Sequence, residues 1–176
     1  MEKEDTQIEG LYLVKFSPNV DERGFFVRNH CVDEFSKLGI KQNFIQSSLS
    51  FNKSKGTMRG LHLQTSPREE VKIIQCLSGK IYDVILDLRP SSKTFKKWQS
   101  FELSLEKLEA LYVPGGCAHG FITLTNDVLI QYRMNENFFP EFQIGVRWDD
   151  PTFDIKWPLK PVTISSRDEN FPNYVK

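Results

Sequence analysis

The 176-residue sequence has no apolar run long enough to cross a bilayer, and residues 1–5 do not resemble a secretory signal. We therefore expect no membrane association. Lys plus Arg and Asp plus Glu number 23 each, so no excess charge favours binding to nucleic acid or a membrane surface. Cysteine is scarce: Cys31, Cys76 and Cys117 lie far apart, without metal or redox spacing. Scattered thiols are typical of a reducing compartment, so we expect a cytoplasmic protein.

The sequence also has no internal repeat, low-complexity tract or linker, so we interpret residues 1–176 as one domain. Patterns with helical periodicity are few. The segment from Asp33 to Gly39 predicts a short helix, because it has an acidic start, apolar residues three apart and a glycine stop. Leu105 to Ala110 is a weaker helical candidate.

What the sequence does contain is a series of short segments rich in β-branched and aromatic residues. From Asn43 onward, Gly, Pro and Asn separate them roughly every 8–12 residues, which is typical of an all-β domain. Ser78-Gly79 between two of them predicts a β-hairpin. Many strands with short connections favour a sandwich or a barrel, and we predict an all-β jelly-roll β-barrel with one or two short helices. The predicted strands span residues 11–16, 25–29, 71–77, 80–88, 98–104, 111–114, 119–124 and 128–134, with a turn or loop at 18–24.

The segment from Arg59 to Gln64 holds the first candidate for chemistry, His62. Side chains alternate between the faces of a strand, so His62 and Gln64 share one face while Leu61 and Leu63 share the other. If this strand lines a barrel, the imidazole points at whatever the barrel encloses, which makes His62 a candidate base. The alternative is a buried, hydrogen-bonded core histidine.

Further polar residues interrupt other apolar strands. Lys72, Asp83, Asp87 and Tyr132 each lie on a segment that is otherwise mostly hydrophobic. An unpaired buried charge is costly, so lysine and carboxylates in such places indicate function. The alternative for the charged residues is an edge strand with a solvated face, and for Tyr132 a core position with a hydrogen-bonded hydroxyl.

A second histidine, His119, follows a glycine-rich turn at the start of a predicted strand. Two histidines on strands suggest a metal site, for which Glu69 or Glu70 could complete the ligand set. Against this hypothesis, His62-x-Gln64 lacks the His-x-His pattern that β-barrel metal sites commonly use.

Two arginines, Arg23 and Arg59, stand beside glycines, where the backbone and a guanidinium can approach an anion closely. By composition alone, the segment from Ser165 to Asp168 is interpreted as a solvated tail.

Six segments, read in order, resemble one known family. They are DERGFF (21–26), GTMRGLHLQ (56–64), DVILDLR (83–89), PGGCAHGF (114–121), RWDDP (147–151) and SSRD (165–168). The chain is similar, nearly from end to end, to the dTDP-4-dehydrorhamnose 3,5-epimerases, cupin-type barrels that act on nucleotide-linked 4-keto-6-deoxy sugars.

This resemblance implies a role for each candidate. It makes His62 the catalytic base, Asp168 the carboxylate that orients it and raises its basicity, and Tyr132 the general acid on the opposite side of the sugar ring. Lys72 would stabilise the enolate oxygen at C4. No metal or organic cofactor is implied, and the assembly is expected to be a homodimer that exchanges an N-terminal segment. Substrate contacts are implied for Arg23, Phe26, Arg28, Gln46, Ser48, Arg59, Gln64, Asp83 and His119.

Two positions depart from the family pattern. Arg28 stands where many members have glutamate, and Ser48 replaces an asparagine, both in the part of the pattern that contacts nucleotide and sugar. We therefore expect an epimerase that inverts C3 and C5 of a nucleotide-diphosphate 4-keto-6-deoxy sugar, with dTDP-4-dehydro-6-deoxyglucose as substrate and a role in surface-polysaccharide synthesis. The alternatives are inversion at C3 alone, a different nucleotide sugar, a metal-binding cupin such as a dioxygenase, and a non-catalytic barrel that binds nucleotide sugars.

Overall fold

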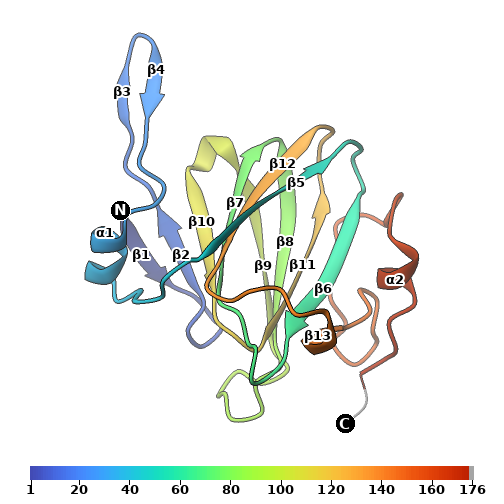
Figure 1. Cartoon of the computed structure of the whole chain (residues 1–176). Helices are drawn as coiled ribbons and strands as arrows, with labels where there is room; N and C mark the ends of the chain where they lie inside the picture. The colour runs from blue at the N-terminus through green and yellow to red at the C-terminus, as the bar shows by residue number, and fades with distance from the viewer. Residues whose placement is uncertain (175–176) are drawn as a thin grey trace.

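Antiparallel strands dominate the computed structural model, which describes residues 1–174 (Figure 1). A six-stranded sheet has the order β1-β2-β10-β7-β12-β5, a five-stranded sheet has the order β13-β6-β11-β8-β9, and β3 and β4 form a separate hairpin. No helix within residues 1–174 is long and apolar enough to cross a bilayer. The elements are β1 (Glu2–Asp5), β2 (Tyr12–Lys15), β3 (Asn19–Asp21), β4 (Gly24–Phe26), α1 (Val32–Lys37), β5 (Gln46–Asn52), β6 (Met58–Gln64), β7 (Lys72–Ser78), β8 (Lys80–Asp87), β9 (Trp98–Ser104), the 3₁₀ turn η1 (Leu105–Lys107), β10 (Glu109–Val113), β11 (Cys117–Thr123), β12 (Val128–Met134), the 3₁₀ turn η2 (Pro140–Phe142), β13 (Gln143–Gly145) and α2 (Ser166–Glu169).

The main core lies between the two sheets. Ile74 of β7 and Ile130 of β12 meet Ile85 of β8 and Phe121 of β11 there, all fully or almost fully buried. Because side chains alternate along a strand, Ile73 points to the other face of β7 and joins a second cluster under α1. The C-terminal segment covers the outer face of the five-stranded sheet. Two sheets packed around an enclosed core form the predicted cupin-like jelly-roll barrel.

Several predictions of local structure are confirmed. The strands predicted at 98–104 and 128–134 have the observed bounds of β9 and β12, and α1 lies within one residue of the predicted helix start. Asp83 and Asp87 are both 0% exposed, so the solvated-face interpretation of these two carboxylates is wrong. The three cysteines are free thiols.

The predicted hairpin at Ser78-Gly79 is wrong. β7 pairs with β10 and β12, whereas β8 pairs with β9 and β11, so this turn carries the chain from one sheet to the other. Gly79 has φ +71°, and a Cβ there would lie 2.5 Å from Thr125 Oγ1. A tight glycine turn between two apolar strands looks the same locally whether the strands pair with each other or with distant partners.

The other differences also come from tertiary pairing. Residues 105–110 form only the short turn η1, after which pairing with β2 and β7 draws the chain into β10. The segment expected to be a turn or loop, 18–24, contributes β3 and the first residue of β4, so it is half of a hairpin. Strands β1, β5 and β13 and the helix α2 were not predicted. β1, β13 and α2 each have only three or four residues and carry no periodic signal, whereas β5 has seven residues, of which three are serine.

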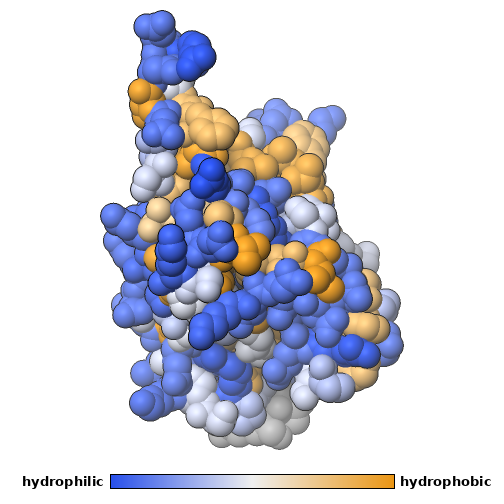
Figure 2. All heavy atoms as spheres, turned by 60° about the vertical axis from the view of Figure 1, so that its left-hand side comes forward, coloured by the Kyte–Doolittle hydropathy of each residue, from blue (hydrophilic) through white to orange (hydrophobic). Residues whose placement is uncertain are grey.

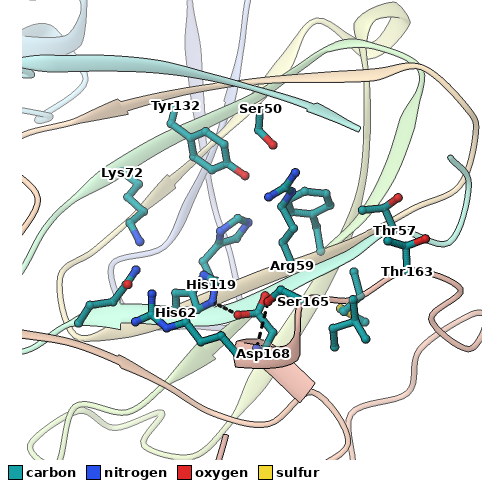
Figure 3. A pocket seen from close by; sticks show the side chains of 15 residues that line it. Ser50, Thr57, Arg59, His62, Lys72, His119, Tyr132, Thr163, Ser165 and Asp168 are labelled. Carbon is teal, nitrogen blue, oxygen red and sulfur yellow. Dashed lines mark hydrogen bonds and ion pairs between the residues drawn. The ribbon is translucent and has the colours of Figure 1, made fainter. Parts of the chain in front are cut away.

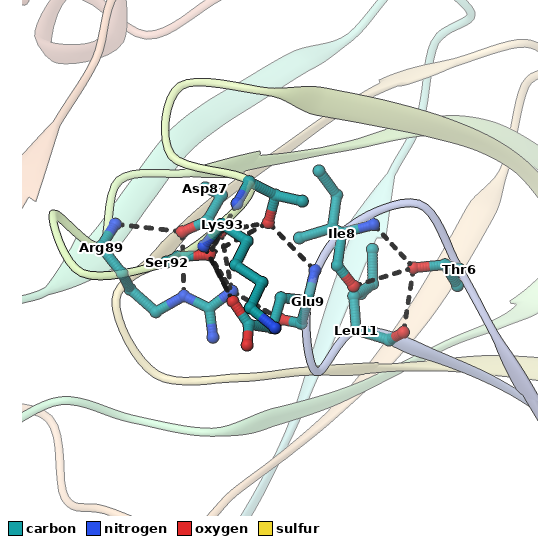
Figure 4. A network of polar contacts seen from close by, with 9 residues as sticks. Thr6, Ile8, Glu9, Leu11, Asp87, Arg89, Ser92 and Lys93 are labelled. Carbon is teal, nitrogen blue, oxygen red and sulfur yellow. Dashed lines mark hydrogen bonds and ion pairs between the residues drawn. The ribbon is translucent and has the colours of Figure 1, made fainter.

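Asp87 is the centre of a polar network that ties the N-terminal turn to the loop after β8 (Figure 4). Its carboxylate accepts hydrogen bonds from the Arg89 guanidinium, Ser92 Oγ and Thr94 Oγ1 at 2.5–2.8 Å, and Arg89 also donates to the Glu9 carbonyl. Burial by itself would raise the pKa of Asp87, but these hydrogen bonds outweigh it and lower the pKa to about 2. The carboxylate is therefore charged in the folded protein at neutral pH.

Asp87→Asn is expected to lower the free energy of unfolding by roughly 2 kcal/mol near neutral pH. Because the folded-state pKa lies below the unfolded value, this stabilisation is complete above about pH 4 and is lost as the pH falls toward 2. Urea unfolding of both proteins at several pH values would measure it. The exposed Asp154 provides a control, for which Asp154→Asn should change stability by less than about 0.5 kcal/mol. A difference for Asp87→Asn that stays constant down to pH 3 would contradict this account.

Candidate active site

One cavity of about 570 Å³ is lined by all four candidate catalytic residues and by Arg59 and His119. Figure 3 shows His62 and Asp168 on one side of it and Tyr132 on the other, with His119 and Arg59 between them and Lys72 at the edge. These side chains come from β6, β7, β11, β12 and α2. A cavity of this size accommodates a small organic ligand.

His62 and Asp168 are in hydrogen-bonding contact with each other in the cavity. His62 Nε2 lies 2.7 Å from Asp168 Oδ1, and the Gly60 N–H donates to Asp168 Oδ2 at 3.1 Å. Ser165 caps the helix by accepting a hydrogen bond from the Asp168 N–H, which places the carboxylate in the first turn of α2. Asp168 is 4% exposed, so the interpretation as a solvated tail is wrong for this residue, whereas Ser165, Ser166 and Arg167 are exposed.

The charge state of Asp168 decides the tautomer of His62. Burial alone would raise the pKa of Asp168, but the hydrogen bonds from His62 and Gly60 hold it below its ordinary value. An ionised carboxylate only accepts hydrogen bonds, so the proton of a neutral His62 must lie on Nε2. Nδ1 then keeps its lone pair and is free to take a proton.

Lys72 reaches the cavity from the first residue of β7, and Tyr132 reaches it from the adjacent strand β12. Lys72 Nζ forms an ion pair with Glu70 Oε1 at 2.8 Å, and both side chains are nearly buried, at 12% and 10% exposed. Burial raises the pKa of Tyr132 above its ordinary value, so its hydroxyl is protonated at neutral pH. Lys72 and Tyr132 also line a neighbouring recess together with Gln46 and Ser48.

His119 stands directly opposite His62 across the β11–β6 ladder. Its Nε2 lies 2.8 Å from Asp83 Oδ2, so both histidines are paired with a carboxylate. Gly60 and Gly120 allow β6 and β11 to approach at this point, since a Cβ on Gly60 would lie 2.5 Å from the Gly120 Cα. Within residues 1–174, no three His, Cys, Asp or Glu side chains converge as a metal-ligand group.

The structure brings together only some of the predicted substrate contacts. Arg59 lines the cavity and is held by a 2.8 Å hydrogen bond to Asn52. Gln64 instead fixes a loop: its amide donates to the carbonyls of Arg68 and Asn137. It lies outside the set of residues that line the cavity.

Three predicted contacts lie away from the cavity of their own chain. Arg23 and Phe26 belong to the hairpin β3–β4, which projects from the barrel (Figure 1), and Arg23 pairs with Asp21 at its tip. Arg28 is exposed and pairs with Glu34 of α1 at 2.9 Å.

Several cavity residues were not identified from the sequence. Thr57, Thr163, Ser165 and Arg167 line the cavity, and Glu70 was considered only as a metal ligand. Thr57 and Thr163 are brought together by an isolated bridge, for which the sequence has no periodic signal.

Comparison with known proteins identifies an isomerase of the epimerase class that acts on carbohydrates, built on a cupin-like jelly-roll barrel. A model of the dTDP-4-dehydrorhamnose 3,5-epimerase family matches residues 5–175. The chain belongs to this family.

Individual relatives agree with this assignment. A dTDP-4-dehydrorhamnose 3,5-epimerase from Shigella flexneri is 38% identical over 164 residues, covering 91% of this chain and 90% of the relative. The crystal structure of such an enzyme from Bacillus anthracis, with TDP and PPi bound, is 35% identical and has a TM-score of 0.96 over 98% of this chain and 99% of that one. A Legionella pneumophila epimerase in complex with dTDP-4-keto-L-rhamnose is 32% identical, with a TM-score of 0.89 over 99% of each chain.

Proposed function

We propose that this protein inverts C3 and C5 of dTDP-4-dehydro-6-deoxyglucose to form dTDP-4-dehydrorhamnose, with His62 as base and Tyr132 as acid. One observation carries the proposal: a carboxylate-paired histidine and a protonated tyrosine lie on opposite sides of one cavity, with a lysine at its edge. The substrate is taken from the relatives, one of which binds dTDP-4-keto-L-rhamnose.

The first half of the reaction removes a proton next to the ketone. The C4 carbonyl makes the hydrogens on C3 and C5 acidic, and His62 Nδ1 takes the C3 proton while the electron pair moves onto the C4 oxygen. The ammonium of Lys72 donates a hydrogen bond to that developing oxyanion. The imidazolium that forms is stabilised by the carboxylate of Asp168, 2.7 Å from Nε2.

The second half returns a proton to the opposite face of the ring. The raised pKa of Tyr132 keeps its O–H intact until the enolate collapses, when the hydroxyl protonates C3 and the C4 carbonyl reforms. Exchange with water then restores the proton of Tyr132 and removes that of His62. The same pair acts on C5 in a second cycle. One C–H bond breaks and one forms in each cycle, so no redox cofactor is required.

The direct test is NMR of dTDP-4-keto-6-deoxyglucose incubated with the protein in deuterated water. Deuterium at both C3 and C5 is the expected result. Label at C3 alone would mean a single inversion. No incorporation at either carbon, in a folded protein that binds dTDP, would overturn the proposed reaction.

The working unit is proposed to be a homodimer in which the hairpin β3–β4 reaches the cavity of the other subunit. Arg23 and Phe26 are exposed on this hairpin, and Phe26 is 71% exposed. Figure 2 shows the polar tip of the hairpin above apolar side chains on the same side of the molecule. Leu49 and Phe51 of β5 are also largely exposed. Contiguous apolar surface of this kind supports an interface between subunits.

Mixed dimers would test this arrangement. Arg23→Glu and His62→Asn are each expected to be nearly inactive alone, but a dimer with one of each has one site with an intact His62 and an intact Arg23 of the partner subunit. Random pairing should therefore restore about a quarter of the wild-type rate. Native mass spectrometry would confirm the mixed dimers. No recovery in their presence would refute exchange of the hairpin.

A further inference from the structure

Phe171 lies directly against the proposed base, although it is outside the residues that line the cavity. Its ring centre is 5.7 Å from that of His62, and the two planes meet at 78°. Edge-to-face contact is a favoured geometry for aromatic rings. Arg167 stacks over Phe171 at 5.8 Å, within the range of a cation–π contact.

The space that Phe171 fills is created by a glycine. Gly145 is the β13 residue directly opposite His62 on β6. Side chains at opposed positions of an antiparallel pair stand next to each other on one face, so any side chain at position 145 would stand beside the imidazole. A Cβ on Gly145 would lie 2.1 Å from both Cε2 and Cζ of Phe171. The aromatic ring therefore takes the place of the missing side chain.

Phe171 also lies two residues beyond the helix that carries Asp168. With four residues, α2 is too short to hold its position unaided. Its N-terminal end is fixed by the Ser165 cap, and Asp168 reaches His62 and the Gly60 N–H. The ring seated on Gly145 fixes the chain on the other side of Asp168.

We infer that Phe171 and Gly145 are a positioning pair for the base. The ring holds the imidazole of His62 in the orientation in which Nε2 meets Asp168 and Nδ1 faces the cavity, and it anchors α2 so that Asp168 stays within reach. This inference rests on the proposed role of His62, but the contact between His62 and Asp168 can be measured without substrate.

The first experiment observes that contact by NMR of the ¹⁵N-labelled protein. The hydrogen-bonded Nε2 proton of His62 is assigned by its loss in His62→Asn. In Phe171→Ala this resonance should broaden or disappear, because the ring and α2 are both released. In Phe171→Leu, which keeps an apolar side chain, it should be retained in part. A resonance unchanged in Phe171→Ala would overturn the inference.

The second experiment compares single and double variants of this pair. Gly145→Ala should lower kcat by about ten- to a hundredfold, since displacement of a catalytic group by about 1 Å costs this much, with little change in KM. Adding Phe171→Ala disrupts the same contact, so the double variant should have about the kcat of the less active single variant, and the two losses should not multiply. Ile144→Ala, at the exposed neighbouring position, serves as the control and should keep wild-type kcat.

The outcomes distinguish failure of the positioning pair from failure of the proposed epimerase reaction. Losses of kcat that multiply in the double variant, or a Gly145→Ala protein with wild-type kcat, would refute the positioning pair. If the wild-type protein exchanges no substrate proton, the proposed reaction fails, while the Nε2 resonance of Phe171→Ala still decides whether Phe171 holds His62 against Asp168. Should Gly145→Ala not fold, the Nε2 resonance of Phe171→Ala and Phe171→Leu still decides whether Phe171 positions His62.

Discussion

His62→Asn is expected to reduce deuterium exchange at C3 and C5 by a factor of roughly 10²–10⁴, the usual contribution of a positioned general base. Asparagine has no group that can take the proton, while it is close to imidazole in size. Binding of dTDP should be little affected, because the change removes the base and leaves Arg59 in place. The exchange rate and dTDP affinity, measured on the same sample, would separate loss of chemistry from loss of binding.

His30→Asn is the matched control. His30 lies outside the cavity, with its ring edge-on to Phe35 and Phe44. The same chemical change there should leave exchange at the wild-type rate, provided circular dichroism shows a folded protein. Substantial exchange by His62→Asn would mean that another group is the base; His119, directly across the ladder, is the first alternative.

Lys72→Met is expected to have the second largest effect, a loss of roughly 10²–10³ in kcat, which is typical for removal of a donor to a developing oxyanion. Methionine keeps most of the apolar volume and loses the charge. The substitution also leaves Glu70 nearly buried without its partner 2.8 Å away, so some loss of stability should accompany it.

A double variant distinguishes the loss of kcat from the loss of stability. In Glu70→Gln with Lys72→Met no charge remains unpaired, so stability should recover relative to Lys72→Met, whereas kcat should not. Lys80→Met, at an exposed position that starts β8, is the control for loss of one positive charge and should change neither quantity. If kcat recovers together with stability in the double variant, Lys72 has a structural role and the enolate is stabilised by another group.

Both predictions concern side chains, His62 and Lys72, for which the sequence indicates the face of the strand on which they lie. Alternation along a strand places His62, Lys72 and Tyr132 on the interior faces of β6, β7 and β12, as expected. The ordered motif segments are sufficient on their own to indicate the family, and the family model covers residues 5–175. These inferences succeed because strand periodicity and ordered motifs are properties of short stretches of chain.

Contacts between distant segments could not be predicted in the same way. Asp168 lies 106 residues from His62, and its pairing with His62 was implied by the family resemblance alone, whereas composition indicated a solvated position. A capped turn and a short helix bring it to 2.7 Å from the imidazole. The Lys72–Glu70 pair and the position of Phe171 over Gly145 were not predicted at all. Only the sheet order reveals that Gly79 joins two sheets.

The sequence by itself therefore determined the all-β class, the interior faces of the main strands, the candidate base, acid and lysine, and the family. The tertiary structure alone decided that Asp83 pairs with His119, that Glu70 neutralises Lys72, and that Arg23 and Phe26 stand away from the cavity of their own chain. The physical reason is that the face of a strand residue follows from its immediate neighbours, whereas its partner follows from strand order and register, which are set by burying the whole core at once.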